Sequence, residues 1–401
     1  MKSSEPVAVV IVMAEAFLIA DNIAGFAPGG NGQARLDFKG GTATGPQRLP
    51  QTPARLAALA VAWPPHVLRQ EDVAANGAEM FATTHGGFAR LAPIYRNALI
   101  ETRHSCVPID WYLKRHSFSE RNDLFLENAL VLLAEASGKA LDQAGLTADQ
   151  LDSIVVVCTT GIATPALDAR LMQVMPFRPD VKRLPVFGLG CAGGVVGLAR
   201  AADMARAHPD DRVLLLVIEL CALTFRAQDR SRSNLVATAL FGDGCAAAVI
   251  SCRDDVTGPA LGVSHEHTWP DSLEVMGWEV VDDGLKVVFS RDIPTLVQND
   301  FRPIAETFLE GQGLTPIDIG GFVCHPGGAR VIDALEDCFA LERGALVHTR
   351  QVLRDHGNMS AATVLFVLKA TLEDRAERAE GPLLLTTLGP GFTTALMLVH
   401  P

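Results

Sequence analysis

The chain of 401 residues has no excess of positive charge, no paired cysteines and no long hydrophobic run. Its formal net charge is -12, with 34 Lys and Arg against 46 Asp and Glu, whereas a nucleic-acid-binding domain normally carries a basic face. We therefore expect no nucleic-acid partner. An anionic small substrate is not excluded, because it needs only a local cluster of Arg or Lys at the mouth of a pocket.

The eight cysteines are scattered, with no C-x-x-C pair and no Cys and His spacing typical of a zinc site. They stand at positions 106, 158, 191, 221, 245, 252, 324 and 338. Such cysteines favour a reducing compartment, so we expect a cytoplasmic protein. The tripeptide His265–Glu266–His267 has no third ligand at a typical spacing. We interpret it as a solvated loop and expect no metal site.

The apolar stretch at residues 7–20 is interrupted by Glu15 and is too short for a membrane span, which needs about 20 residues. No convincing signal cleavage site follows it. Residues 24–53 are rich in Gly, Pro, Thr, Gln and Asn, a composition that buries too little apolar surface to order itself. We therefore predict that residues 1–53 form a poorly ordered extension and that the chain has no membrane span.

With 48% hydrophobic and 20% charged residues, the rest of the chain has the composition of a globular protein. Apolar runs alternate with segments of helical period, and continuous apolar strands of this kind are typical of sheets buried on both faces. The strands are expected from residue 55 to the Pro64–Pro65 break and at 153–160, 185–190, 212–220 and 245–252, with helices from about residue 71, at 124–145 and at 191–207.

The second half of the chain repeats this order. Strands are expected at 319–326, 382–391 and 393–400, with helices at 329–341 and 360–376. Each half also ends in a glycine turn followed by an apolar strand, "LFGDGCAAAVIS" in the first and "TLGPGFTTALMLVH" in the second. We predict an α/β fold with two duplicated halves, divided as 54–255 and 256–401.

Cys191 lies at the junction between a buried strand and a helix that begins with Gly and Ala. The positive end of the helix dipole lowers the pKa of a cysteine in this position, so we expect a reactive thiolate. The competing interpretation is a small buried hydrophobe, which is what a free cysteine usually is.

His325 follows an apolar strand and precedes a Pro-Gly-Gly turn, and Asn358 precedes an Ala-rich helix. The imidazole could pair with a thiolate, and the amide could donate to a thioester oxygen. Taken singly, the histidine could equally be a satisfied surface residue and the asparagine a turn or N-cap residue. Together with Cys191 they supply the groups that covalent acyl transfer uses.

The motifs around these residues resemble those of the type III polyketide synthases, of the chalcone-synthase-like kind within the thiolase-like group. "GLGCAGG" is similar to the nucleophile motif, "HPGG" to the histidine motif, and "GNMS" to the asparagine motif. "FGDGCAAAVI" and "LGPGFTT" resemble two further stretches of the family. The resemblance runs from about residue 55 to the C-terminus and implies a five-layered αβαβα fold and a homodimer.

The resemblance also implies roles for individual residues. Cys191, His325 and Asn358 would be the catalytic triad, and Phe241 would be the aromatic gatekeeper between the coenzyme A tunnel and the cavity. Arg90 and Arg96 fall near the basic residues that contact coenzyme A in the family. The family's substrate-binding places fall on Thr159, Thr160, Glu219, Cys221, Thr224, Ser360, Gly389 and Pro390.

The activity implied is loading of an acyl-CoA starter on Cys191, repeated decarboxylative condensation with malonyl-CoA, and ring closure. Coenzyme A thioesters would be substrates, and no cofactor is expected. "VFGLGCAGG" looks like bacterial members that take long acyl chains, so the leading product is an alkylresorcinol or alkylpyrone. The nearest alternative is a ketoacyl-carrier-protein synthase III, which condenses once. A hydroxymethylglutaryl-CoA synthase using Glu219 as base, or a non-catalytic acyl-binding protein, fits less well.

Overall fold

The computed structural model describes residues 52–80, 93–290, 293–374 and 380–401. The apolar stretch at 7–20 and nearly all of the predicted extension at 1–53 lie outside these residues. Residues Gly45–Pro401 form one compact unit. The division of this unit at residue 255 therefore stays a prediction.

Nine strands form one mixed sheet in the order β11-β12-β13-β8-β1-β7-β6-β4-β5. The strands of the N-terminal half are β1 (Arg55–Ala62), β4 (Ser153–Cys158), β5 (Lys182–Phe187), β6 (Arg212–Leu220) and β7 (Asp243–Ser251). Those of the C-terminal half are β8 (Ala260–Thr268), β11 (Gly321–Cys324), β12 (Leu383–Gly389) and β13 (Thr393–His400). The two halves meet where β1 lies beside β8, through the single registered pair Arg55 and Ala260.

The strand directions repeat between the halves. In the first, β4 is parallel to β6, and β7 is antiparallel to both β6 and β1. In the second, β11 is parallel to β12, and β13 is antiparallel to both β12 and β8. The predicted duplication is thus confirmed, because β4-β6-β7-β1 and β11-β12-β13-β8 have the same order and directions.

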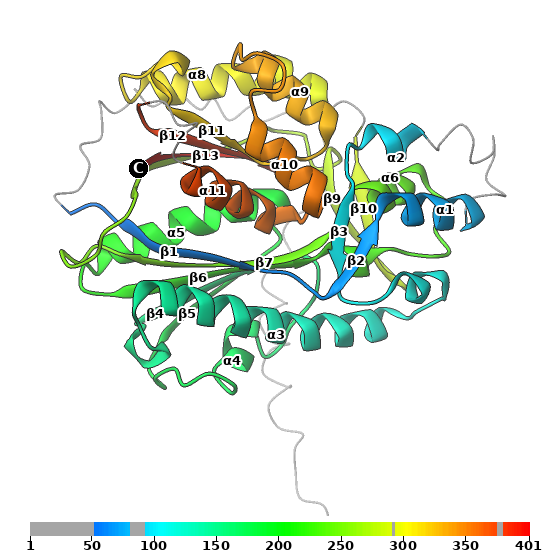
Figure 1. The fold of residues 1–401 in the computed structure, drawn as a ribbon, viewed down its shortest axis with the longest axis horizontal. Helices are drawn as coiled ribbons and strands as arrows, with labels where there is room; N and C mark the ends of the chain where they lie inside the picture. The colour runs from blue at the N-terminus through cyan, green and yellow to red at the C-terminus, as the bar shows by residue number, and fades with distance from the viewer. Residues whose placement is uncertain (1–51, 81–92, 291–292, 375–379) are drawn as a thin grey trace, which may run out of the picture. The chain divides into compact units, whose positions relative to one another are not determined.

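Helices and strands alternate in five layers (Figure 1). The helix α3 (Phe118–Ala144) covers the outer face of the N-terminal strands, and α8 (Arg302–Glu310) and α9 (Ala329–Cys338) lie beyond the C-terminal strands. Between the two sets of strands lie α5 (Gly193–Ala207) and α11 (Thr363–Glu373), which contact both sets. The expected αβαβα arrangement is confirmed.

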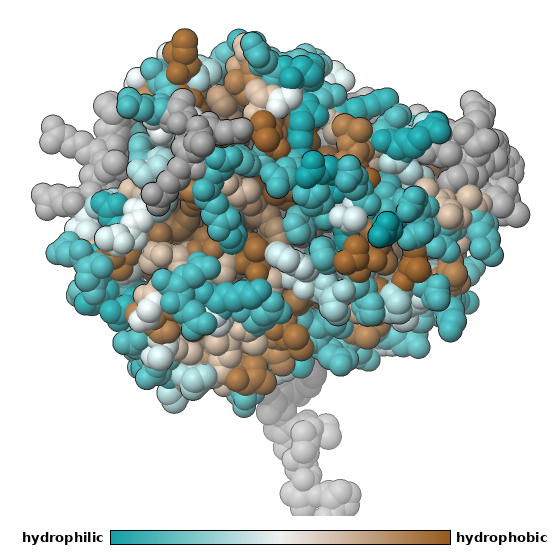
Figure 2. Space-filling model, in the orientation of Figure 1, coloured by the Kyte–Doolittle hydropathy of each residue, from teal (hydrophilic) through white to brown (hydrophobic). Residues whose placement is uncertain are grey.

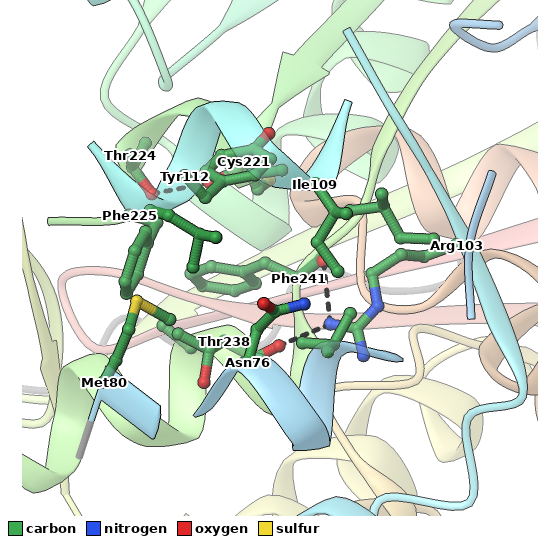
Figure 3. A pocket seen from close by; sticks show the side chains of 15 residues that line it. Asn76, Met80, Arg103, Ile109, Tyr112, Cys221, Thr224, Phe225, Thr238 and Phe241 are labelled. Carbon is green, nitrogen blue, oxygen red and sulfur yellow. Dashed lines mark hydrogen bonds between the residues drawn. The ribbon is translucent and has the colours of Figure 1, made fainter. Parts of the chain in front are cut away.

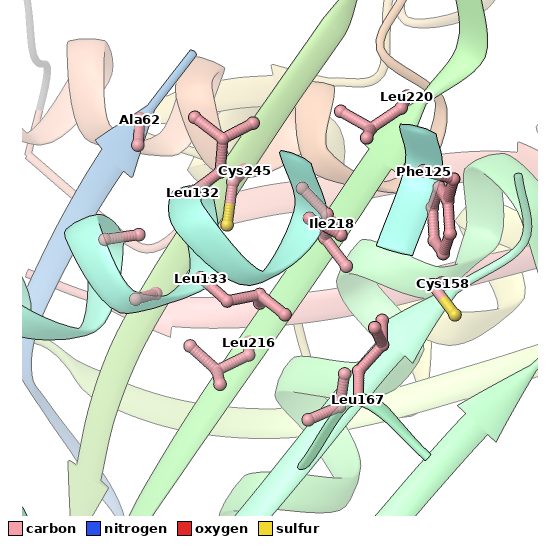
Figure 4. Packing of buried hydrophobic residues seen from close by; sticks show 14 of the residues in the cluster. Ala62, Phe125, Leu132, Leu133, Cys158, Leu167, Leu216, Ile218, Leu220 and Cys245 are labelled. Carbon is pink, nitrogen blue, oxygen red and sulfur yellow. The ribbon is translucent and has the colours of Figure 1, made fainter. Parts of the chain in front are cut away.

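The core between α3 and the N-terminal strands shows why this layering is stable. Phe125, Leu132 and Leu133 of α3 pack on Leu216 and Ile218 of β6 (Figure 4). Burying a side chain of this size contributes about 1.5–3 kcal/mol. A second apolar cluster surrounds α5 and α11, and a third lies under α8 and α9.

The end signals of α3 agree with its sequence. Ser117 accepts a hydrogen bond from the N–H of Glu120, whose carboxylate accepts one from the N–H of Ser117 in return, the reciprocal pattern of a capping box. The helix ends at Gly145, which has φ 65°, a conformation that suits glycine.

The remaining helices and short strands connect these layers. They are α1 (Gln70–Met80), α2 (Pro93–Asn97), α4 (Leu167–Leu171), α6 (Arg232–Leu240), α7 (Ile293–Leu296), α10 (Val347–His356), and the strands β2 (His66–Arg69), β3 (Thr102–Ser105), β9 (Met276–Val281) and β10 (Gly284–Phe289). Short single turns of helix lie at Ile109–Leu113, Ala148–Gln150, Gly190–Ala192, Cys221–Thr224, Val297–Phe301, Pro316–Asp318 and Ser360–Ala362.

Three details of the sequence interpretation are wrong. The segment His265–His267 is not a loop but part of β8, where it pairs with Thr394–Leu396 of β13. Here the backbone pairing outweighs the polar side chains. The strand expected at 185–190 lies at 182–187, because the chain turns at Gly188, which has φ 91°. The hairpin of β9 and β10 was not anticipated, since its exposed strands lack a continuous apolar run.

On the face shown in Figure 2, hydrophobic residues lie between polar ones at the surface. Among the described residues, no helix combines the length and the apolar character that crossing a membrane would require.

Candidate active site

Cys191 sits in the tight turn Gly190–Ala192, between β5 and α5, and its side chain is buried. The turn depends on Gly190, which has φ 47° and whose added Cβ would lie 2.6 Å from the Pro390 ring. The N–H of Gly190 donates to the hydroxyl of Thr159 at 3.0 Å. The local backbone therefore presents the sulfur at the start of the central helix α5.

His325 directly follows β11, and its backbone N–H donates to the carbonyl of Thr386 on β12 at 2.9 Å. The side chain is 4% exposed, and neither ring nitrogen has a hydrogen-bond partner. A buried imidazole with both nitrogens unpaired is costly, since buried polar groups are normally satisfied. The ring is thus available to a ligand.

Asn358 is held by backbone and side chain alike. Its N–H donates to the carbonyl of Leu240, and its carbonyl accepts from Gly242, so that Asn358 and Phe241 form a β-bridge. The amide Nδ2 donates to the carbonyl of Gly327 at 3.3 Å, and Oδ1 accepts from the N–H of Ser360 at 2.8 Å. The asparagine therefore connects the loop after His325 with the segment that holds Phe241.

These three side chains line one cavity. Cys191 comes from the N-terminal half, and His325 and Asn358 come from the C-terminal half. The apolar wall of the cavity is formed by Ile94, Val236, Leu240, Met276, Phe289, Ile293, Val331 and Leu388. Three residues more than 30 positions apart in sequence thus face the same enclosed space, as the expected triad requires.

The structure corrects the expectation that the pKa of Cys191 is low. Burial raises the pKa of Cys191 to about 12, and the hydrogen bonds from Ser360 and Asn358 offset this only in part. Burial likewise lowers the pKa of His325 to about 3. Both effects have one cause, because a buried site disfavours either charge. Burial therefore opposes both the expected thiolate and a protonated imidazole.

A buried carboxyl lies beside the nucleophile turn. Glu219, at the end of β6, is fully buried, and its Oε2 accepts from both the N–H and the hydroxyl of Thr160 and from the N–H of Thr159. Its Oε1 has no partner. Burial raises the pKa of Glu219 to about 7, and the three hydrogen bonds oppose that rise.

A second, mostly apolar pocket has Phe241 in its lining (Figure 3). Cys221, Thr224 and Phe241 line it, together with Ile109, Tyr112, Phe225, Met80, Leu68 and other residues. The ring of Phe241 lies 5.8 Å from that of Phe289, which belongs to the cavity of Cys191. Phe241 thus lines the second pocket and contacts one residue of the cavity of Cys191; its role as an aromatic gatekeeper stays a prediction.

Comparison with known proteins identifies this arrangement. The family model for the N-terminal domain of chalcone and stilbene synthases matches residues 45–254, and the model for the C-terminal domain matches residues 260–401. The chain belongs to the chalcone and stilbene synthase family. It is therefore a type III polyketide synthase, an enzyme that transfers acyl groups.

Individual relatives support the same family assignment. A 1,3,6,8-tetrahydroxynaphthalene synthase of Streptomyces peucetius subsp. caesius is 40% identical over 86% of this chain and 92% of its own length. A 3,5-dihydroxyphenylacetyl-CoA synthase of Amycolatopsis balhimycina is 30% identical over 78% and 85%. The crystal structure of the tetrahydroxynaphthalene synthase of Streptomyces coelicolor A3(2) superimposes with a TM-score of 0.80 at 28% identity, covering 86% of this chain and 99% of that one.

Among the other residues singled out in the sequence, Gly389 and Pro390 pack against the nucleophile turn. A Cβ on Gly389 would lie 2.6 Å from the backbone nitrogen of Ala192. Ser360 lies beside the sulfur of Cys191 and takes a left-handed backbone conformation with φ 48°. These residues therefore lie around the nucleophile turn, and their contact with a substrate stays a prediction.

Two arginines were expected near coenzyme A, and only Arg96 lies among the described residues. Arg90 lies outside the described residues, and Arg96 is exposed on α2 without lining the cavity. The cavity is instead lined by Arg232 and Arg330. Sequence reasoning missed both, since an isolated arginine after "DRS" or "GGA" carries no motif of its own. Among the described residues no group of His, Cys, Asp and Glu could hold a metal ion.

Proposed function

We propose that this synthase loads an acyl-CoA starter on Cys191, extends it by repeated decarboxylative condensation with malonyl-CoA, and closes the chain to a resorcinol or a pyrone. The observation that carries the proposal is that Cys191, His325 and Asn358 line one cavity. A nucleophile, a base and an amide donor around one acyl group are the components of covalent acyl transfer.

In the loading step, the imidazole of His325 takes the proton of the Cys191 thiol as the sulfur attacks the starter carbonyl. Coenzyme A leaves as its thiol, and the acyl group stays on the sulfur. Burial disfavours a charge on either group, so the attack of the sulfur is coupled to this proton transfer. Proton transfer by a positioned side chain typically contributes a hundredfold to ten thousandfold in rate.

In the extension step, malonyl-CoA loses carbon dioxide and leaves an enolate at its thioester. The Nδ2 of Asn358 and the imidazole of His325 donate hydrogen bonds to the enolate oxygen. The enolate carbon then attacks the acyl-Cys191 carbonyl, forms the carbon–carbon bond and releases the sulfur. The lengthened chain returns to Cys191 for another round, until it cyclises.

The starter chain would lie in the apolar pocket beyond Phe241. This pocket is lined mostly by hydrophobic side chains and borders Cys221, whose thiol pKa is raised by burial and also by Glu219, Asp243 and Cys191. Apolar walls favour an alkyl starter over a polar one, since burial of each methylene contributes about 0.8 kcal/mol. An alkylresorcinol or alkylpyrone is therefore the product that we propose.

The assembly that we propose is a homodimer without a cofactor. The strand β5 lies at the edge of the nine-stranded sheet, and Phe187 on it is 59% exposed. An exposed edge strand of this kind is a template for pairing with another chain. All eight cysteines are free, which supports a reducing cytoplasm.

A second candidate is a synthase that primes itself with malonyl-CoA and makes tetrahydroxynaphthalene, favoured by the 40% identity to the Streptomyces peucetius enzyme of that name. The comparisons give no support to the ketoacyl-carrier-protein synthase III alternative.

The test is to incubate the purified enzyme with malonyl-CoA, alone and with a series of acyl-CoA starters, and to weigh the products. Incorporation of an alkyl starter into a cyclic product supports the proposal. A naphthalene product from malonyl-CoA alone, unaffected by added starters, supports the second candidate. A single β-keto thioester would refute both.

A further inference from the structure

The hairpin of β9 and β10 stands apart from the nine-stranded sheet. Its two strands form a separate two-stranded sheet, and β10 contacts α6 (Figure 1). A hairpin of two strands is at best marginally stable by itself in water. The position of this hairpin therefore depends on the contacts that it makes with the rest of the chain.

The base of the hairpin forms part of the wall of the cavity of Cys191. Met276 and Phe289 pair with each other across the two strands, and both line that cavity. Midway along the hairpin, the side chain of Val287 packs in one apolar cluster with Phe241. A shift of the hairpin would therefore change the shape of the cavity.

The tip of the hairpin borders a second space. Gly284 and Leu285 line a small pocket together with Thr160 and Thr224. These two threonines are among the residues for which contact with a substrate is predicted. The hairpin thus extends from the cavity of Cys191 at its base to this small pocket at its tip.

An ion pair holds the tip of the hairpin. Nε and Nη2 of Arg226 both lie 2.7 Å from Oδ1 of Asp283, which precedes the first residue of β10. Nη1 of the same arginine donates to Asp229 at 3.0 Å. The side chains of Arg226 and Asp283 are 14% and 23% exposed. Two charge-assisted hydrogen bonds that are largely shielded from solvent hold the tip more firmly than an exposed ion pair does.

The loop that carries Arg226 is itself fixed to α6. Nδ2 of Asn234 donates to the carbonyls of Arg226 and Asp229, at 2.9 and 2.8 Å. Asn234 is buried in the first turn of α6, and the same helix is followed directly by Phe241. The pair of Arg226 and Asp283 therefore connects the tip of the hairpin to the helix against which the hairpin packs.

We propose that Arg226 and Asp283 are positioning residues that hold the hairpin against α6 and thereby set how many malonyl units the synthase adds before the chain cyclises. The inference rests on the proposed function. Neither side chain lines the cavity of Cys191, so both act through the hairpin. A firmly held wall limits the room for the growing chain. When the ion pair is broken, the tip moves away more readily and the chain gains room for a further unit.

The test begins with Asp283→Asn, which removes the charge and keeps the size of the side chain. We expect hydrogen exchange of the backbone amides of residues 276–289 to accelerate about tenfold or more, the factor that loss of a hydrogen bond to a charged group represents.

The products are weighed after incubation with malonyl-CoA and the acyl-CoA starter that the wild type incorporates best. The ratio of products with one additional malonyl unit to products of the wild-type length should rise about tenfold, by the same shift of the equilibrium. Acylation of Cys191 by the starter alone should change by less than about twofold, since the ion pair does not reach the sulfur.

Companion variants make the result specific. Arg226→Gln should have the same effects as Asp283→Asn, and the double variant should be no worse than Arg226→Gln alone, because both substitutions remove one interaction. Asp283→Glu should restore part of the protection from exchange, since it keeps the carboxylate. The matched control is Lys286→Gln, which breaks the exposed pair of Lys286 and Glu279 on the same hairpin. It should leave the exchange and the product ratio within about twofold of the wild type.

Unchanged exchange in Asp283→Asn would overturn the inference, because the ion pair would then not hold the tip. Faster exchange with unchanged or shorter products would overturn it too, as would longer products in Lys286→Gln. If the wild type makes no cyclic product with any starter, the proposed function fails. If it makes cyclic products whose lengths are the same in all variants, only the inference about the ion pair fails.

Discussion

Glu219 offers a pH-dependent test of the buried site. The carboxyl is fully buried beside the nucleophile turn, and burial raises its pKa from 4.5 to about 7. The substitution Glu219→Gln removes the ionisation but keeps an oxygen that can accept from Thr159 and Thr160. Any free-energy cost of the new amide is the same at every pH. The pH dependence of the difference in free energy of unfolding therefore reports only on the carboxyl.

Between pH 4.5 and about 7, the unfolded chain has lost the Glu219 proton while the folded chain still holds it. The free energy of unfolding of the wild type therefore falls as the pH rises through this window. Each pH unit contributes about 1.4 kcal/mol, so the loss is about 3 kcal/mol. The Gln variant does not lose this free energy, because it has no carboxyl to ionise. Asp243, whose pKa burial also raises to about 7, is present in both proteins and cancels in the comparison.

The measurement is denaturant unfolding of both proteins at pH 5, 6, 7 and 8. We expect the free energy of unfolding of the variant, minus that of the wild type, to rise by about 3 kcal/mol from pH 5 to pH 8. A difference that stays constant with pH would refute the reasoning. It would mean that Glu219 ionises in the folded protein as readily as in the unfolded one.

Three further predictions concern activity and packing. Asn358→Ala should retain acylation of Cys191 by mass spectrometry but decarboxylate malonyl-CoA about 100- to 1000-fold more slowly; decarboxylation at the wild-type rate would contradict the role of the amide. Gly194→Ala should destabilise the protein by about 1–3 kcal/mol in thermal unfolding, because its Cβ would lie 2.3 Å from the Ala361 carbonyl oxygen. The control Gly138→Ala, whose Cβ would have nothing within 4 Å, should stabilise helix α3 by up to about 1 kcal/mol. Equal shifts of the two variants would refute the packing argument. Arg103→Met should cost at least about 2 kcal/mol in denaturant unfolding, because it leaves the buried carbonyls of Thr238 and Phe241 without their donor; an unchanged midpoint would contradict this.

The secondary structure was readable where local signals are strong. The long helical period at 124–145 predicted most of α3, although not its start at Phe118 after the Ser117 cap, and the apolar runs predicted β4 and β6. The hairpin of β9 and β10 and the strand character of His265–His267 were not readable, because pairing with a distant strand decides them. Backbone hydrogen bonds across the sheet do not depend on the polarity of the side chains that they join.

The features of the site also divide into those that the sequence predicted and those that it did not. Motif order predicted Cys191, His325 and Asn358, because each stands next to a glycine turn at the end of a strand or helix. The effect of burial was not predicted: it raises the pKa of Cys191, against the thiolate expected from the helix dipole, and lowers the pKa of His325. Desolvation is a property of the folded surroundings and cannot be assigned from neighbours in sequence.

By itself the sequence determined the α/β class and the duplicated order of elements through periodicity, and it supplied the candidate catalytic side chains through turn chemistry and family motifs. Only the tertiary structure decided that Arg232 and Arg330 line the cavity of Cys191 and that Arg96 does not. Those facts depend on how α6 and α9 are placed relative to Cys191. Packing across the sheet sets that placement, and no local signal in the chain encodes it.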